Sequence, residues 1–195
     1  MKNIILLATA ICCAFTSHAQ KDKREEGVKI GLKGGLNVSN FMGDLEDNAI
    51  RTSIHIGVVS EFIISDKFSI QPELLYSGQG FSNQNPAGFS RGKFDYINLP
   101  VLAKYYLVKN LSLETGPQIG FLISAKNKTN DSNDEIEDQK TLDFSLNLGL
   151  GYELNNGVFF QARYNHGITN INDSPSSDSI KYTNSVYQFS VGILF

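Results

Sequence analysis

Nine charged side chains recur at alternate positions along otherwise apolar segments of this 195-residue chain. Four are basic and five are acidic, so their charges nearly balance. Because an unpaired charge is costly away from water, such residues either pair with one another or line a conducting, proton-relaying path. We expect mutual ion pairs that fill a narrow interior. The nine residues are Lys29, Lys33, Glu61, Glu73, Lys104, Glu114, Asp143, Glu153 and Arg163.

Two histidines beyond the first twenty residues are the candidates for hydrolytic chemistry. His55 and His166 stand near the ends of alternating segments, and a nucleophile would have to come from Ser39, Ser53 or Ser185. No spacing marks a nucleophile, histidine and acid set, so we interpret both histidines as rim residues and expect no enzyme. The sequence also contains no His/Cys/Asp cluster with metal spacing and no phosphate-binding glycine loop, and we expect no cofactor.

Period-two alternation of apolar and polar residues predicts the strands that carry these side chains. Eight alternating segments occur, at about 28–38, 53–63, 68–79, 94–107, 111–125, 142–153, 158–166 and 185–195. Short turns are expected at 65–67, 108–110 and 155–157, and long polar loops at about 39–52, 81–93, 126–140 and 167–184. Short and long connections alternate, as they do in an antiparallel up-and-down meander.

One face of these segments is apolar and free of charge, which leaves two kinds of eight-stranded barrel. A lipocalin-like soluble barrel would turn that face inward around a ligand, and a transmembrane barrel would turn it outward to lipid. The opposite rows are rich in glycine and small residues, as a narrow lumen requires. The sequence has no Trp and, after its first twenty residues, no cysteine, which a lipocalin would be expected to have. We therefore predict an all-β fold, an eight-stranded antiparallel up-and-down transmembrane β-barrel.

Aromatic residues at both ends of the apolar rows support this prediction, because interfacial girdles of transmembrane barrels contain such residues. The last alternating segment also ends on an aromatic residue, Phe195, which resembles the signal that barrel-insertion machinery reads. Toward the short turns the predicted girdle consists of Phe62, Phe68, Tyr105, Tyr152, Phe160 and Phe195. Toward the long loops it consists of Tyr76, Phe121, Tyr164 and Tyr187.

The chain is expected to form one folded domain behind a leader. Its longest apolar run, Ile4 to Phe15, follows Lys2 and precedes the small residues around Ala19. We interpret residues 1–19 as a signal peptide, 20–27 as a short lead and 28–195 as the barrel domain. Cleavage after Ala19 would remove both cysteines, so no disulfide is expected. The formal net charge of −3 comes without a basic cluster, which argues against nucleic-acid binding.

Four motifs carry a family resemblance. They are QPELLYS at 71–77, YINLPVLAKYY at 96–106, GPQIGFL at 116–122 and RYNHGITNI at 163–171. Together they resemble the PorT-like outer-membrane β-barrel family, often labelled porin family. The resemblance implies a barrel in the outer membrane of a Gram-negative bacterium and little about activity. Because Pro72, Pro100 and Pro117 cannot donate to a ladder, we expect bulges or gaps beside them.

The function expected from the sequence is structural or adhesive, carried out by a monomeric barrel with a packed polar lumen and exposed loops. A narrow porin-like channel for small solutes is the alternative. Expected partners are outer-membrane lipid and lipopolysaccharide, the insertion machinery that reads the strand ending at Phe195, and an envelope or extracellular protein. The loop at 126–140 has five acidic residues and three lysines, and it either binds a cation bridge or partner or is only solvated.

Overall fold

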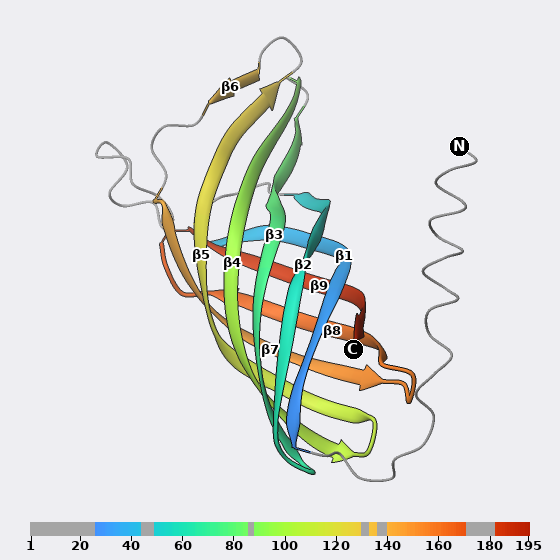
Figure 1. Cartoon of the computed structure of the whole chain (residues 1–195). Helices are drawn as coiled ribbons and strands as arrows, with labels where there is room; N and C mark the ends of the chain where they lie inside the picture. The colour runs from blue at the N-terminus through green and yellow to red at the C-terminus, as the bar shows by residue number, and fades with distance from the viewer. Residues whose placement is uncertain (1–25, 44–48, 86–87, 130–132, 136–139, 171–181) are drawn as a thin grey trace, which may run out of the picture.

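The computed structural model is one closed antiparallel β-barrel, described over residues 26–43, 49–85, 88–129, 133–135, 140–170 and 182–195 (Figure 1). Eight long strands form the wall in the order β4-β3-β2-β1-β9-β8-β7-β5, and pairing of β4 with β5 closes it. The predicted fold class is therefore confirmed. The strands are β1 (Gly27–Gly43), β2 (Ala49–Ser65), β3 (Phe68–Asn85), β4 (Gly88–Val108), β5 (Leu111–Thr129), β7 (Leu142–Glu153), β8 (Val158–Gly167) and β9 (Tyr182–Leu194).

Alternation along each strand decides which side chains point outward. In β7 every second residue is buried, with Leu146, Leu148 and Leu150 outside and polar or small residues inside. The same separation holds around the barrel, so the outer wall is apolar and the lumen is polar. An apolar surface of this extent is unfavourable in water and is what a bilayer requires of a spanning barrel. The outward orientation of the apolar rows is confirmed.

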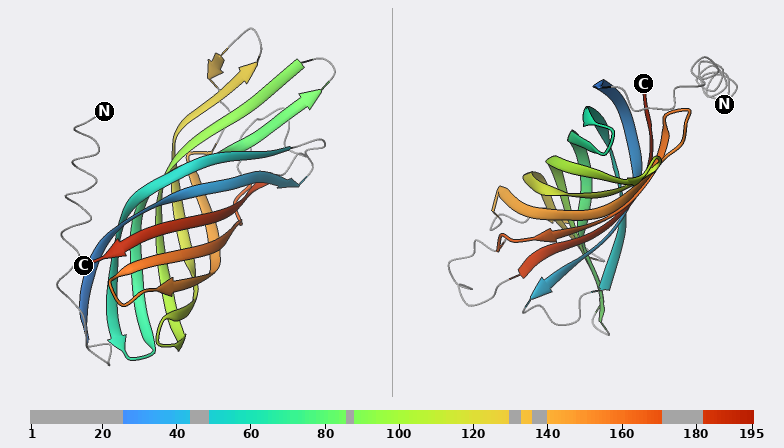
Figure 2. Two further views of the ribbon diagram at one scale, coloured as in Figure 1. Left: turned by 90° about the vertical axis from the view of Figure 1, so that its right-hand side faces the viewer. Right: turned by 90° about the horizontal axis from the view of Figure 1, so that it is seen from below.

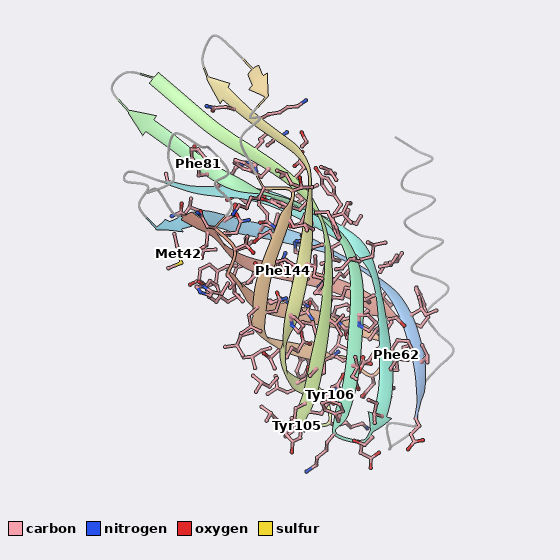
Figure 3. The ribbon with its side chains drawn as sticks, turned by 90° about the vertical axis from the view of Figure 1, so that its left-hand side faces the viewer. Met42, Phe62, Phe81, Tyr105, Tyr106 and Phe144 are labelled. Atoms are coloured by element: carbon pink, nitrogen blue, oxygen red, sulfur yellow. The ribbon has the colours of Figure 1, made fainter. Side chains whose placement is uncertain are left out.

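The predicted aromatic girdle residues lie on the outer wall. Figure 3 shows Phe62 and Tyr105 toward the short-turn end of the barrel and Met42 toward the long-loop end. Phe62, Tyr105 and Tyr187 expose about half of their surface, as residues that contact lipid do.

Three short turns connect the strands at one end, as predicted. They lie at 66–67, 109–110 and 154–157. Gly157 has φ of +83°, a conformation that a residue with a side chain adopts only with strain. Leu194 donates its amide to the Gly157 carbonyl at 2.9 Å, which ties this turn to β9.

The strands run further than the alternation predicts at the other end. β3 and β4 stay paired from Phe68↔Tyr105 to Asn85↔Gly88, and β5 continues to Thr129 (Figure 2). The three-residue strand β6 (Asn133–Glu135) adds to β5 there. The expected loops at 39–52, 81–93 and 126–140 were thus wrong in part, because backbone pairing with a neighbour does not need one apolar face. The expected loop at 167–184 lies mostly outside the described residues.

The three prolines interrupt pairing without shifting the register. Steps without paired residues flank Pro72 in the β2–β3 and β3–β4 ladders and Pro100 and Pro117 in the β4–β5 ladder. The expectation of bulges or gaps is met by gaps, and the bulges lie elsewhere, one of them between Asp95 and Tyr96 in the β4–β5 ladder. Because no bulge falls at a proline, the inward and outward assignments along these strands survive.

None of the described residues forms a helix long and apolar enough to cross a membrane. The predicted signal peptide at 1–19 and most of the lead at 20–27 lie outside the described residues.

Candidate functional site

A buried carboxylate from β3 organises the middle of the lumen. Arg163 on β8 binds Glu73 through both terminal guanidinium nitrogens. Nη2 lies 2.9 Å from Oε1, and Nη1 lies 3.1 Å from Oε2. Lys33 on β1 lies on the same carboxylate, with Nζ 2.8 Å from Oε2. All three side chains are at most 1% exposed. Paired in this bidentate way, charges from strands far apart in the sequence are held in fixed geometry.

A second carboxylate, Glu61 on β2, lies nearer the short turns. Tyr106 donates its hydroxyl to Glu61 Oε1 at 2.7 Å, and Lys104 Nζ lies 3.3 Å from Oε2. The Lys104 ammonium also donates to Gln71 Oε1 at 2.9 Å. Gln71 in turn donates to Glu73 Oε1 at 2.7 Å, so the two carboxylate groups belong to one connected set.

The third carboxylate, Glu114 on β5, completes that set. Its oxygens accept hydrogen bonds from Gln161 Nε2 and from Ser112 Oγ, the latter at 3.2 Å. Lys104 and Arg163 each lie 3.8 Å from it. A Cβ at position 151 would overlap this carboxylate, so Gly151 leaves the space that Glu114 occupies.

We call these six charged residues the central network: Lys33, Glu61, Glu73, Lys104, Glu114 and Arg163. Three cations face three carboxylates, so the formal charge is 3 − 3 = 0. Lys33 also donates to Gln161 at 2.8 Å, which links the β1 side of the network to the β5 side. The arrangement places a neutral set of buried ion pairs across the lumen.

The other three predicted residues lie away from the centre. Lys29 and Glu153 form a pair of their own at the short-turn end, 2.6 Å apart and partly exposed. Asp143 lies toward the long loops, where it accepts a hydrogen bond from Asn184 at 2.7 Å and has no ion pair in the described part of the chain. The structure therefore brings together six of the nine residues, places two in a separate pair and leaves Asp143 apart.

The interpretation of His55 as a rim residue is wrong. Its side chain is 1% exposed inside the lumen, because its neighbours Ile54 and Ile56 face lipid. Its Nδ1 lies 2.7 Å from Asn37 Oδ1 and its Nε2 lies 2.7 Å from Ser190 Oγ. Asn37 and Ser190 were not among the predicted site residues, although both occupy polar-row positions that alternation turns inward.

His166 does lie at the loop end, on the outer wall. It is exposed, and its Nδ1 is 3.3 Å from the Tyr164 hydroxyl. The three serines considered as nucleophiles bond elsewhere. Ser39 donates to the Gly80 carbonyl, Ser53 to the Gly78 carbonyl and Ser185 to the Tyr164 hydroxyl.

Apolar side chains also enter the lumen, whereas the sequence predicts a lumen lined by polar and small residues. Phe94 and Tyr96 form a buried cluster toward the long loops, against Phe81, Leu122 and Ala125. A second cluster of Val59, Phe159 and Leu194 lies toward the short turns. Among the described residues, no group of three or more His, Cys, Asp or Glu side chains is arranged to hold a metal ion.

Solved outer-membrane barrels share this fold. Ail, the attachment invasion locus protein of Yersinia pestis, superposes with a TM-score of 0.55 at 12% identity, covering 88% of this chain and 100% of that one. Neisserial surface protein A superposes with a TM-score of 0.59 at 11% identity, covering 87% and 100%. At such identities the likeness concerns the fold alone. No curated protein sequence matches the chain.

The family comparison agrees with the barrel fold and its apolar outer wall. The pattern of the family described as outer membrane protein beta-barrel domain matches residues 18–173, most of the chain. The protein is accordingly located in the outer membrane of a Gram-negative bacterium. On this match and this fold, the chain belongs to the outer membrane protein beta-barrel domain family.

Proposed function

We propose that this barrel does not conduct solutes and that it acts through its long-loop end, in a structural or adhesive role toward a partner in the envelope or outside the cell. The observation that carries the proposal is the central network, a neutral set of buried ion pairs across the lumen. An interior built from eight strands is just wide enough for side chains to fill.

The central network resists opening because its members depend on one another. Glu73 is shared by Lys33 and Arg163, so moving one side chain leaves a buried charge without its partner. Such a loss costs about 3–5 kcal/mol in buried pairs. Transient rearrangement into a pore is accordingly rare.

The strand extension supports a role for the long-loop end. β3, β4 and β5 stay paired beyond the barrel, which gives a hydrogen-bonded platform instead of isolated loops (Figure 1). Ail is named for attachment and invasion, and its similarity to this chain is one of fold alone. An attachment role here is therefore our proposal and rests on the sealed lumen and the paired extension.

Single-channel recording in planar bilayers tests the sealed lumen. We expect no resolved conductance steps from the wild-type protein. The Glu73→Gln/Arg163→Gln variant removes both charges while keeping a polar side chain at each position, and it should also stay closed because packing, as well as charge, fills the lumen. Reproducible conductance steps from the wild-type protein would favour the alternative, a narrow porin-like channel.

A shortened extension tests the proposed role of the long-loop end. Gly80 and Lys93 are register partners, so residues 81–92 can be replaced by an Asn-Gly turn without changing the pairing below. Cells that display this variant should attach less to immobilised matrix proteins and glycans than cells with the full barrel. Equal attachment, with equal amounts of protein at the surface, would contradict an adhesive role.

We also propose that the chain lacks catalytic activity and is a PorT-like member of its family. Ser190, His55 and Asn37 form a hydrogen-bonded series, but the series is buried within the lumen. An enzymatic activity that disappears in the His55→Ala variant would contradict the proposed lack of catalysis.

The PorT-like assignment is supported by the motifs that contain Pro100 and Pro117, which lie on the paired strands β4 and β5.

A further inference from the structure

Backbone pairing places four basic positions next to one another where β4 and β5 leave the barrel. Lys93 on β4 is the register partner of Lys126 on β5, and two residues further along, Arg91 is the partner of Lys128. We call these four positions the basic ladder. Directly opposed like charges destabilise an antiparallel pair, and here two such pairs follow one another.

A bulge in β5 decides which way the basic ladder faces. Tyr96 pairs with Leu122 but Asp95 pairs with Ser124, so Ile123 is an extra residue on β5. Leu122 and Ala125, three residues apart, consequently both pack against the inner cluster of Phe94 and Tyr96. Without the extra residue, Ser124 and Lys126 would share the inward face of Leu122. With it, they share the outward face of Asp95 and Lys93.

The basic ladder begins just above the lipid-facing belt. On β4, Lys93 stands four residues beyond the outward Ile97, and on β5, Lys126 stands three residues beyond the outward Ile123. At a rise of about 3.3 Å per residue and a tilt of about 40°, these positions lie about 7–10 Å above the last apolar side chains. The headgroup layer of a bilayer leaflet is about 5–8 Å thick, so the two heights correspond.

Few carboxylates of the described residues share this face. The backbone of Glu135 on β6 pairs with that of Lys126, and Asp95 lies two residues from Lys93 on β4. Two acidic positions therefore accompany the four basic ones. In the part of the chain that the structure describes, β1, β2, β8 and β9 place no exposed Lys or Arg on the outer wall at this end. Apart from a buried arginine on β2, the basic positions at this end among the described residues are those of β4 and β5 and Lys140, which lies ahead of β7.

We propose that the basic ladder binds the phosphate groups of lipopolysaccharide in the outer leaflet. Lys and Arg bind phosphate through charge-assisted hydrogen bonds, and basic clusters beside a membrane recognise anionic headgroups. A lipid is the fitting source of phosphate because the ladder continues directly into the apolar belt. A headgroup bound there leaves its acyl chains against Ile97 and Ile123. The inference rests on the proposed function, in which the long-loop end is the working surface.

Reconstitution into phosphatidylcholine nanodiscs with and without lipopolysaccharide tests the proposal. Lipopolysaccharide retained per barrel and the midpoint of thermal unfolding are the two measurements. We expect the wild-type protein to retain lipopolysaccharide and to unfold at a higher temperature with it. The Lys93→Gln/Lys126→Gln variant should bind it roughly thirtyfold more weakly, since each of the two lysines near an anionic surface contributes about one kilocalorie per mole.

The matched control makes the same charge change at the other end of the barrel. Lys67 and Lys109 lie in the short turns, so Lys67→Gln/Lys109→Gln should retain lipopolysaccharide as the wild-type protein does. An equal loss in this control, or no loss in the Lys93→Gln/Lys126→Gln variant, overturns the proposal.

Two further samples identify the source of the phosphate. Dephosphorylated lipid A should not raise the unfolding temperature of the wild-type protein. Inorganic phosphate or a soluble sulfated polysaccharide, added to nanodiscs without lipopolysaccharide, should leave it unchanged, and an equal rise would overturn the lipid assignment. Single-channel conductance recorded from the same variants distinguishes failure of the proposed function from failure of lipopolysaccharide binding. An open lumen would contradict the proposed function, but it would not change lipopolysaccharide retention.

Discussion

The lumen and the basic ladder differ in how their charged residues are paired. In the central network each cation lies against a carboxylate, as Arg163 does against Glu73. In the basic ladder, cation is set opposite cation, as Lys93 is opposite Lys126. A closed interior has no other source of counter-charge, so the fold must supply it. Above the bilayer, water and anionic groups can supply it, and like charges persist where a ligand compensates them.

The largest effect should come from removing the carboxylate at the centre of the lumen. Glu73→Ala leaves Lys33 and Arg163 buried without their shared partner, and we expect a loss of about 3–5 kcal/mol in unfolding free energy. Urea unfolding in lipid vesicles measures it. Glu153→Gln, at the partly exposed pair with Lys29, is the control and should cost about 1 kcal/mol or less. Equal losses would show that burial does not distinguish the two pairs.

Filling the space beside the third carboxylate should have the next largest effect. In Gly151→Val the new side chain overlaps Glu114 and Ser112, and overpacking of this kind costs about 1–3 kcal/mol. The control is Gly34→Ala on the outer wall, where the nearest atom to the new Cβ is 3.5 Å away. Its unfolding free energy should stay close to that of the wild-type protein. A tolerated Gly151→Val would mean that the network is loosely packed.

Replacing the buried histidine should have an intermediate effect. His55→Ala removes contacts to Asn37 and Ser190 inside the lumen, and we expect a cost of about 1–3 kcal/mol from the groups left unsatisfied. His166→Ala on the exposed outer wall should change the unfolding free energy by less than about 0.5 kcal/mol. Equal unfolding free energies for His55→Ala and His166→Ala would contradict the assignment of His55 to the buried lumen and His166 to the exposed wall.

The smallest effect should come from correcting a like-charge pair in the basic ladder. Lys93→Glu turns the Lys93 and Lys126 pair into one of opposite charge, which should stabilise the extension by about 0.2–1 kcal/mol in membranes without lipopolysaccharide. Slower hydrogen exchange of the β4 and β5 amides would report it. The same variant should lose stabilisation by lipopolysaccharide, and a gain in both conditions would contradict the assigned role of the ladder.

Much of the barrel could be predicted from the sequence because one rule, alternation, links residue type to face. It correctly turned Leu148 toward lipid and Glu114 toward the lumen. It could not give the partners of each charge, since Lys29 is the register partner of Glu61 yet its ammonium binds Glu153 on β7. Partner choice depends on how strands from distant parts of the chain approach across the lumen.

Two further features depend on structure that alternation does not encode. The bulge at Ile123 moves Lys126 from the inner to the outer face, and no residue type in β5 predicts a bulge at this position. The extension of β3 and β4 to Asn85 and Gly88 comes from backbone pairing between polar segments, which the pattern represents as loop. Both features lie where the bilayer no longer forces one face of the strand to be apolar.

The central claim is that paired and packed side chains together seal the lumen. The sharpest test compares the wild-type protein with a Glu73→Gly/Arg163→Gly variant by single-channel recording in one bilayer, after heat-modifiable gel mobility has shown both to be folded. We predict a silent wild-type barrel and stepwise ion current from the variant, whose lumen has lost two large side chains. Stepwise current of the same size from both proteins would contradict the account.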